Sequence, residues 1–218
     1  MLVCSGRPQR KRDEVRGTAT TGDETEIQAG YEYILTAARR LVIEQGLEVT
    51  MDQIAAATGV SRRTLFRHFA SRERVIVEAF TAGMDGYAHQ LPPFSGDRDS
   101  WLKQTCLAAH RLNTGSGPGF WALTYRTDLP AELRELETTR RARQRSAAKN
   151  VARTLWRASG RHSLPPPTLT ACVLAHICPY FTGAVVIEGD QTWQDAAQLA
   201  YDAIHAQLCR LLTNETSS

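Results

Sequence analysis

Apolar residues recur every three or four positions along most of this chain, which is the spacing of one face of a helix. The first clear run is Tyr31, Ile34, Leu35, Ala38, Leu41 and Val42. Gly46 follows it, and a glycine placed just after the last periodic residue commonly ends a helix. No segment alternates apolar and polar residues long enough to predict a strand. The pattern therefore predicts an all-α protein.

Three short helices are expected next. Thr50 and Gln53 have the spacing of a capping box, and Gly59 can adopt the positive φ that a tight turn between helices needs. Ser61 can cap the second short helix and Ser71 the third. The helix that Ser71 caps is expected near residues 71–90, and further helices are expected near 98–113, 120–127, 131–159, 168–188 and 192–212, with glycine and proline between them.

The first two short helices have the features of a helix-turn-helix. On the helix that begins at Ser61, Leu65 and Phe69 share one face and can pack on the helix before it. Arg67 falls nearly opposite them, with Arg63 and Thr64 beside it. Arginine pairs with guanine edges, threonine can contact a base edge or a thymine methyl, and an α-helix fits the major groove. We predict that this outward face reads double-stranded DNA.

The predicted DNA contacts extend to both ends of this helix. Phe66 and His68 lie at its margins, near the expected phosphate walls, and Arg72 stands beside free backbone N–H groups at the next helix N-terminus. One arginine alone would be a solvated surface charge, whereas four around one exposed helix favour DNA binding. The full predicted set is Thr50, Arg62, Arg63, Thr64, Phe66, Arg67, His68 and Arg72.

Residues from about 31 to 80 resemble the DNA-binding domain of the tetracycline-repressor (TetR) family. The residues that carry the resemblance are Thr50, Ile54, Ala55, Gly59, Val60, Ser61, Thr64, Leu65, Phe66, Phe69, Ser71, Arg72 and Glu73. The family often has tyrosine where Phe66 stands and lysine where Arg72 stands, so the Phe66 contact would be apolar and Arg72 keeps the charge. Neither departure removes the resemblance.

The resemblance implies an N-terminal three-helix helix-turn-helix domain followed by a helical ligand-binding and dimerisation domain. Such a protein is a ligand-responsive transcriptional regulator, here expected to be a repressor that binds a palindromic operator as a homodimer. We expect a flexible basic arm over residues 1–26, the DNA-binding domain over 27–80 and the helical domain over 81–218. The arm carries Arg7, Arg10, Lys11 and Arg12 and is either a disordered tail or a contact to DNA phosphates or the minor groove.

The last two expected helices are apolar over a wide arc, which indicates burial on more than one side. Two such helices from each subunit would form a four-helix dimer interface, although an intramolecular core pair is the alternative. The predicted interface residues are Leu174, Phe181, Val185, Leu208 and Leu212.

Aromatic and histidine side chains gather in the middle helices, which predicts a small-molecule pocket. Trp121 and Tyr125 are four residues apart and share one side of a helix. The predicted pocket residues are Trp121, Tyr125, Trp156 and His176, and the expected effector is largely apolar or aromatic. Core packing is the alternative for each aromatic residue. Seven basic residues between Arg140 and Arg157 are read as a solvated face, with an acidic ligand or a second DNA contact as the alternative.

Composition narrows the function classes. The net charge of +3 is too small by itself to indicate nucleic acid, and five scattered cysteines suit a reducing cytoplasm. The N-terminus has no apolar run of signal-peptide length, and the apolar stretch from Ala171 to Ile187 is short for a membrane span and contains Pro179, so no membrane association is expected.

No glycine-rich phosphate loop, nucleophile elbow or paired-histidine zinc helix indicates an enzyme, and no cofactor is expected. One alternative keeps the same fold but makes it a metal- or thiol-responsive regulator. Cys172 and His176 are four residues apart and could face one metal ion, and Cys178 is close to them in sequence.

Overall fold

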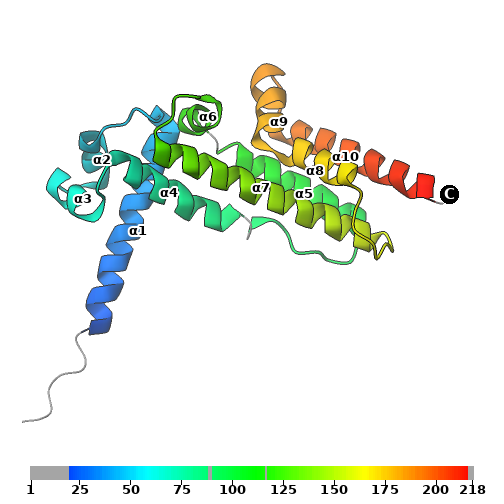
Figure 1. The fold of residues 1–218 in the computed structure, drawn as a ribbon, viewed down its shortest axis with the longest axis horizontal. Coiled ribbons are helices and arrows are strands. Elements are labelled where there is room, and N and C mark those ends of the chain that lie inside the picture. Colours follow the sequence, from blue (N-terminus) through cyan, green and yellow to red (C-terminus); the bar gives the residue numbers. More distant parts are fainter. Residues whose placement is uncertain (1–19, 88–89, 116, 216–218) are drawn as a thin grey trace, which may run out of the picture.

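In the computed structural model, residues 20–87, 90–115 and 117–215 are described, and they contain helices and no strand (Figure 1). The helices are α1 (Thr20–Gln45), α2 (Met51–Thr58), α3 (Arg62–His68), α4 (Arg72–Tyr87), α5 (Arg98–Asn113), α6 (Pro118–Tyr125), α7 (Ala131–Ala158), α8 (Pro167–Ile177), α9 (Pro179–Gly183), the π-helical turn η2 (Ala184–Glu188) and α10 (Trp193–Glu215). The all-α prediction is confirmed for these residues.

Two predicted boundaries are wrong. Helix α1 begins at Thr20, so residues 20–26, which the sequence assigned to a flexible arm, are helical; the basic cluster of that arm lies outside the described residues. The single helix expected over 168–188 is divided into α8, α9 and η2, with a bend of 46° between α8 and the segment that follows it. Pro179 explains the break, because proline has no N–H and its ring clashes with the preceding turn of a helix.

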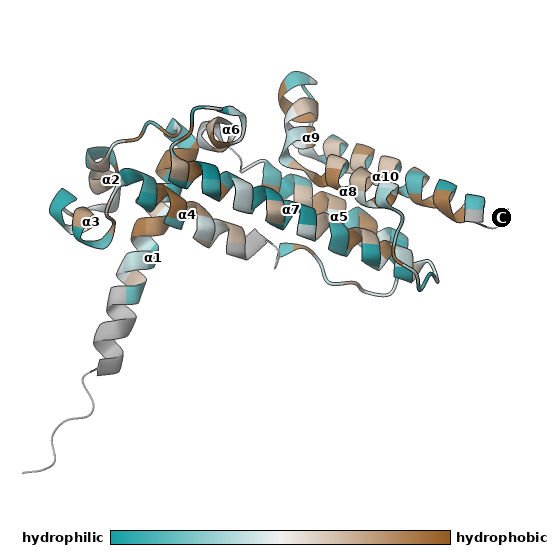
Figure 2. Cartoon of the chain, in the orientation of Figure 1, coloured by the Kyte–Doolittle hydropathy of each residue, from teal (hydrophilic) through white to brown (hydrophobic). Residues whose placement is uncertain are grey.

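The buried apolar residues form two cores. The first core is formed by the helices α1, α2, α3 and α4, together with Leu123 of α6 and with Leu133 and Leu136 of α7. The second core is formed by α5, the later part of α7, α8 and α10, and it includes Trp156 and Leu208, which are both completely buried. Figure 2 shows hydrophobic colour where α1 meets α4 and along α8 and α10, whereas much of α7 is hydrophilic. The long helix α7 therefore contributes to both cores and connects them.

Helix α6 lies directly on the backbone of α1. A Cβ at Gly119 would stand 2.1 Å from the carbonyl oxygen of Val42, and a Cβ at Gly117 would stand 2.3 Å from that of Ile43. Real Cβ atoms essentially never come so close, so only glycine allows this approach. The helical body, which consists of α5 to α10, thus packs against the C-terminal end of α1.

Candidate nucleic-acid interface

Local capping fixes the start and end of α2. The Thr50 hydroxyl accepts a hydrogen bond from the Gln53 backbone N–H at 3.2 Å, and the Gln53 side chain accepts one from the Thr50 N–H at 2.7 Å. Gly59 follows the helix with φ of +71°, in the left-handed region. The predicted capping box and glycine turn are both confirmed. The Thr50 hydroxyl already serves as a cap, so any contact it makes to DNA would add to that bond.

Helix α3 is held by its inward face. Ser61 accepts the Thr64 backbone N–H at 3.1 Å, and the side chains of Leu65 and Phe69 are completely buried against α1, α2 and α4. The opposite face is open, because Arg63 and Arg67 are exposed and Phe66 is 44% exposed. The burial pattern confirms the predicted inward and outward faces of α3.

The charges on the outward face differ in availability. Arg62 is paired with Asp52 of α2 at 3.1 Å and lies over the Phe66 ring at 5.5 Å. Within the described part of the chain, Arg63 and Arg67 have no hydrogen-bond or ion-pair partner. These two guanidinium groups can therefore take an acceptor on DNA without breaking an existing contact.

Thr64 and His68 flank this face and are partly engaged. The Thr64 hydroxyl lies 2.9 Å from that of Ser61, and the exposed His68 ring lies 6.4 Å, centroid to centroid, from the Tyr31 ring of α1. Both remain positioned at the surface that the sequence predicted.

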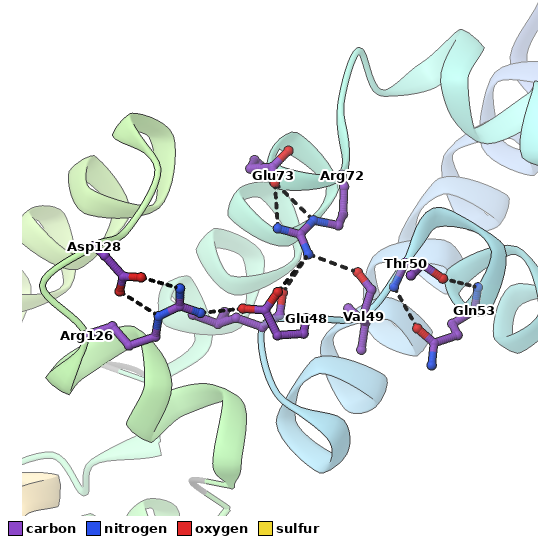
Figure 3. Close-up of polar contacts among 9 residues, drawn as sticks. Glu48, Val49, Thr50, Gln53, Arg72, Glu73, Arg126 and Asp128 are labelled. Carbon is purple, nitrogen blue, oxygen red and sulfur yellow. Dashed lines mark hydrogen bonds and ion pairs between the residues drawn. The ribbon is translucent and has the colours of Figure 1, made fainter.

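Arg72 differs from Arg63 and Arg67, because its guanidinium is already bound inside the domain (Figure 3). It donates to Glu73 at 2.7 and 3.0 Å and to the backbone oxygens of Leu47 and Val49 at 3.0 and 3.4 Å. Burial raises the pKa of Glu73, but the hydrogen bond and charge of Arg72 outweigh this, so that the pKa lies below its ordinary value. The sequence motif located Arg72 correctly, but its long side chain folds back onto the loop before α2.

The same network reaches the helical body. Glu48 lies 3.9 Å from Arg72 and also accepts a hydrogen bond from Arg126, at the end of α6, whose guanidinium in turn donates to Asp128 at 2.8 and 2.9 Å (Figure 3). These hydrogen bonds raise the pKa of Arg126 and lower that of Asp128. Glu48 and Arg126 are 78 residues apart in sequence, and no local pattern signals their pairing.

The four residues predicted for a ligand pocket do not come together. Trp121 and Tyr125 stack at 5.9 Å and meet Tyr180 in a surface cluster, where Tyr125 is 64% exposed. Trp156 is completely buried, and its indole N–H donates to Ser163 at 3.1 Å. His176 lies against Phe181, 5.0 Å between ring centroids. A cavity of about 430 Å³ lies between α1, α4, α5, α6 and α7, and none of the four residues lines it.

The predicted dimer residues divide into two groups. Leu208 is completely buried within its own chain, so it faces the second core and not a partner; this corrects the assignment. Leu174, Phe181 and Leu212 are half-buried against the same core, and Val185 is half-buried on η2. On α10, the large apolar residue that is open to solvent is Leu199, which is 50% exposed.

Cys172 and His176, the pair that the metal- or thiol-responsive alternative requires, lie close together, but their polar atoms are engaged by the backbone. The Cys172 sulfur lies 3.6 Å from His176 Nδ1, but that nitrogen also lies 2.8 Å from the Cys172 carbonyl oxygen. The Cys178 thiol donates to the Ala175 carbonyl at 3.1 Å. Burial raises the pKa of Cys172, which disfavours the reactive thiolate.

Within the described helices, none is by itself long and apolar enough to cross a membrane. The bent pair Pro167–Ile177 and Pro179–Glu188 satisfies the length and composition criteria only when both segments are taken together.

Helix α2, closed by the left-handed Gly59, and helix α3, with its buried inner face and exposed arginines, together have the geometry of a helix-turn-helix. The family model described as bacterial regulatory proteins, tetR family, matches residues 34–79, which span α1 to α4. An uncharacterized HTH-type transcriptional regulator of Mycobacterium bovis is 31% identical over 80 residues, which are 36% of this chain and 42% of that protein. The chain thus aligns with 28% to 42% of the length of the curated relatives it matches.

Solved structures extend the likeness in fold to most of the chain. A TetR-family regulator from Rhodococcus sp. has a TM-score of 0.63 at 18% identity and covers 83% of this chain and 99% of its own. The regulator FadR from Bacillus subtilis, in complex with stearoyl-CoA, has a TM-score of 0.60 at 14% identity and covers 80% of this chain and 96% of its own. Residues 34–79 thus match the N-terminal DNA-binding domain of the TetR family of bacterial regulatory proteins, and most of the chain is similar in fold to solved structures of such regulators.

Proposed function

We propose that this protein is a ligand-released repressor that binds a palindromic operator as a homodimer in the cytoplasm. The observation that carries the DNA-binding part is the outward face of α3, where Arg63 and Arg67 are exposed and unpaired within the described chain. A bound dimer over a promoter would exclude the transcription machinery, which is the basis for expecting repression.

In this proposal, α3 enters the major groove with Arg63, Thr64 and Arg67 toward base edges. Arg62 would exchange Asp52 for a phosphate, a change that costs little because both side chains of that ion pair are more than half exposed. Thr50, Phe66 and His68 would stand along the groove walls. Arg72 takes no direct part and instead fixes the loop before α2.

Dimerisation is proposed on the outer face of α8 and α10. Exposed small or apolar residues on this face include Ala171, Ala175, Leu199 and Ala206, and small residues let helices from two subunits approach closely. A two-fold dimer would present two α3 helices to successive major grooves, which is why a palindromic operator is expected.

The experiment begins by selecting DNA from a random pool with the purified protein and sequencing the bound fraction. A palindromic consensus is expected. On that site, Arg63→Ala and Arg67→Ala should each lose roughly 1–3 kcal/mol of binding free energy and relax discrimination at one base position. Arg145→Ala, an exposed arginine on α7, is the matched control and should bind normally. Unchanged binding by both α3 variants would disprove the assignment of the reading helix.

A further inference from the structure

The cavity of about 430 Å³ lies between the DNA-binding domain and the helical body. Its walls come from α1 and α4 on one side and from α5, α6 and α7 on the other. The volume is within the range of small-molecule sites, about 300–1,000 Å³. Since a water molecule occupies about 30 Å³ of liquid, the cavity has room for roughly a dozen non-hydrogen atoms.

The lining combines apolar walls with positive charge. Apolar side chains that contribute are Ile43, Phe80, Met84, Leu112, Phe120 and Leu136. The charged side chains are those of Arg39, Arg140 and Arg143, and the described lining includes no aspartate or glutamate. In the described lining every charged side chain is cationic, which favours an anion that carries an apolar body.

Arg39 is the guanidinium that lacks a counter-charge. It projects from α1 across α4 at Gly83, where an added Cβ would stand 2.3 Å from the Arg39 Cζ atom. Within the described chain it has no hydrogen-bond or ion-pair partner, and partial burial lowers its pKa. The missing Cβ at Gly83 thus lets an unpaired cation lie against the helix that leads out of the DNA-binding domain.

The α7 side of the cavity adds a buried donor. Arg140 is held by Glu137 at 2.6 and 2.9 Å and lies over the Phe120 ring at 5.2 Å. It also donates to the Gln144 Oε1 atom at 3.2 Å, and the buried Nε2 of Gln144 has no hydrogen-bond partner. Buried amide donors are nearly always satisfied, so this N–H points to an acceptor that a bound molecule would bring.

We propose that this cavity binds an organic anion with an apolar body of about ten carbons, whose carboxylate or phosphate group pairs with Arg39. The proposal rests on the ligand response proposed above and names the chemical class of the effector. The sequence predicts an effector that is largely apolar or aromatic, and the present proposal adds one anionic group to it. Because Arg39 belongs to α1 and Gln144 to α7, one bound molecule would connect the reading domain to the helical body.

The test measures binding of four probes of equal chain length by calorimetry, without DNA. Decanoate and decyl phosphate are the anionic probes, decanol is the neutral probe and decyltrimethylammonium is the cationic probe. One or both anions should bind at least about tenfold more tightly than decanol, since a hydrogen bond to a charged group is worth that much or more. Which anion is preferred distinguishes a carboxylate from a phosphate effector. Equal binding of decanol, or no binding of either anion, would overturn the proposal.

Variants locate the site. Arg39→Gln should weaken the preferred anion by about tenfold or more and leave decanol unchanged, whereas Arg40→Gln, its exposed neighbour on α1, should leave both unchanged. Ala147→Leu, in the cavity wall, should weaken both probes by filling the space. An equal loss in Arg39→Gln and Arg40→Gln would refute the assignment to Arg39. Within the described chain Arg39 makes no hydrogen bond or ion pair, and Arg40 is exposed, so neither change removes a contact that holds the fold.

DNA release is measured separately on the selected operator. A protein that binds decanoate through Arg39 but selects no DNA would disprove the proposed function and leave the anion site standing. A protein that selects a palindrome but shows no anion preference would disprove the anion site and leave the proposed DNA binding standing.

Discussion

Replacing Arg72 with alanine should destabilise the DNA-binding domain and leave the chemistry of DNA reading intact. The change removes four hydrogen bonds, two to Glu73 and two to the backbone oxygens of Leu47 and Val49. Leu47 and Val49 are only 3% and 2% exposed, so their carbonyl groups would regain water poorly. Taking about 1 kcal/mol for each carbonyl bond and up to about 1 kcal/mol for the partly exposed ion pair gives a loss of about 2–3 kcal/mol. That is a large fraction of the stability of a typical domain, about 5–15 kcal/mol.

The assay is urea unfolding followed by circular dichroism, combined with operator binding across a salt series. Arg63→Ala is the matched control, because it removes an exposed arginine with no partner in the described chain. We expect Arg72→Ala to unfold at lower urea and to retain the salt dependence of DNA binding under conditions where it is folded. Arg63→Ala should unfold at the same urea concentration as the unchanged protein and lose discrimination at one base position of the operator. Arg72→Lys should recover only part of the stability, since lysine lacks the planar fork. Normal stability with a smaller salt slope in Arg72→Ala would show that Arg72 contacts phosphate after all.

Three further predictions concern the helical body. Gly119→Ala should lower the unfolding free energy by about 1–3 kcal/mol, because the new Cβ meets the Val42 backbone oxygen, whereas Gly30→Ala, on the open side of α1, should be neutral or stabilising in the same urea titration. Burial lowers the pKa of His110 from 6.5 to about 4. Below pH 7 the unfolded chain therefore binds a proton that the folded chain does not, and the unfolding free energy should fall by about 2 kcal/mol from pH 7 to pH 5. His110→Gln should flatten this part of the plot of unfolding free energy against pH, and an unchanged slope would contradict the prediction. Leu199→Glu should convert dimers to monomers in sedimentation velocity, and an intact dimer would exclude this part of α10 from the interface.

Features set by neighbouring residues could be predicted from the sequence. The capping box at Thr50, the left-handed Gly59 and the burial of Leu65 and Phe69 follow from spacing and backbone preference within one or two turns. The break at Pro179 has an equally local cause, and weighing proline against the apolar run would have found it. Most helix boundaries after α4 agree with the periodicity to within a few residues for the same reason.

Features that depend on where distant helices meet could not be predicted this way. Periodicity shows that Leu208 has an apolar environment but does not say whether its own chain or a partner supplies it. In the structure, α5 and α8 of its own chain supply it. A large apolar side chain such as Trp156 suits a ligand pocket and a protein core equally well, and in the structure it is a completely buried core residue. Arg72 shows the limit for long side chains, because its backbone position follows from the motif while its guanidinium reaches residues 23 and 25 positions earlier.

The contacts between the two parts of the chain also limit how an effector could act. Helix α6 is fixed to α1 at one end by the glycine contact with Val42 and at the other by Arg126, which binds Glu48 beside Arg72. At Gly119 the two backbones are in direct contact, so this attachment leaves no room for movement toward α1. The attachment at Arg126 is a solvent-exposed ion pair with Glu48, which can exchange partners at little cost. A molecule that enters the cavity next to α6 and displaces it would therefore change the Arg126 end first. That end lies on the loop that positions α2 and, through it, α3, so the weaker attachment is the one placed to transmit a ligand-induced shift to the DNA-reading face.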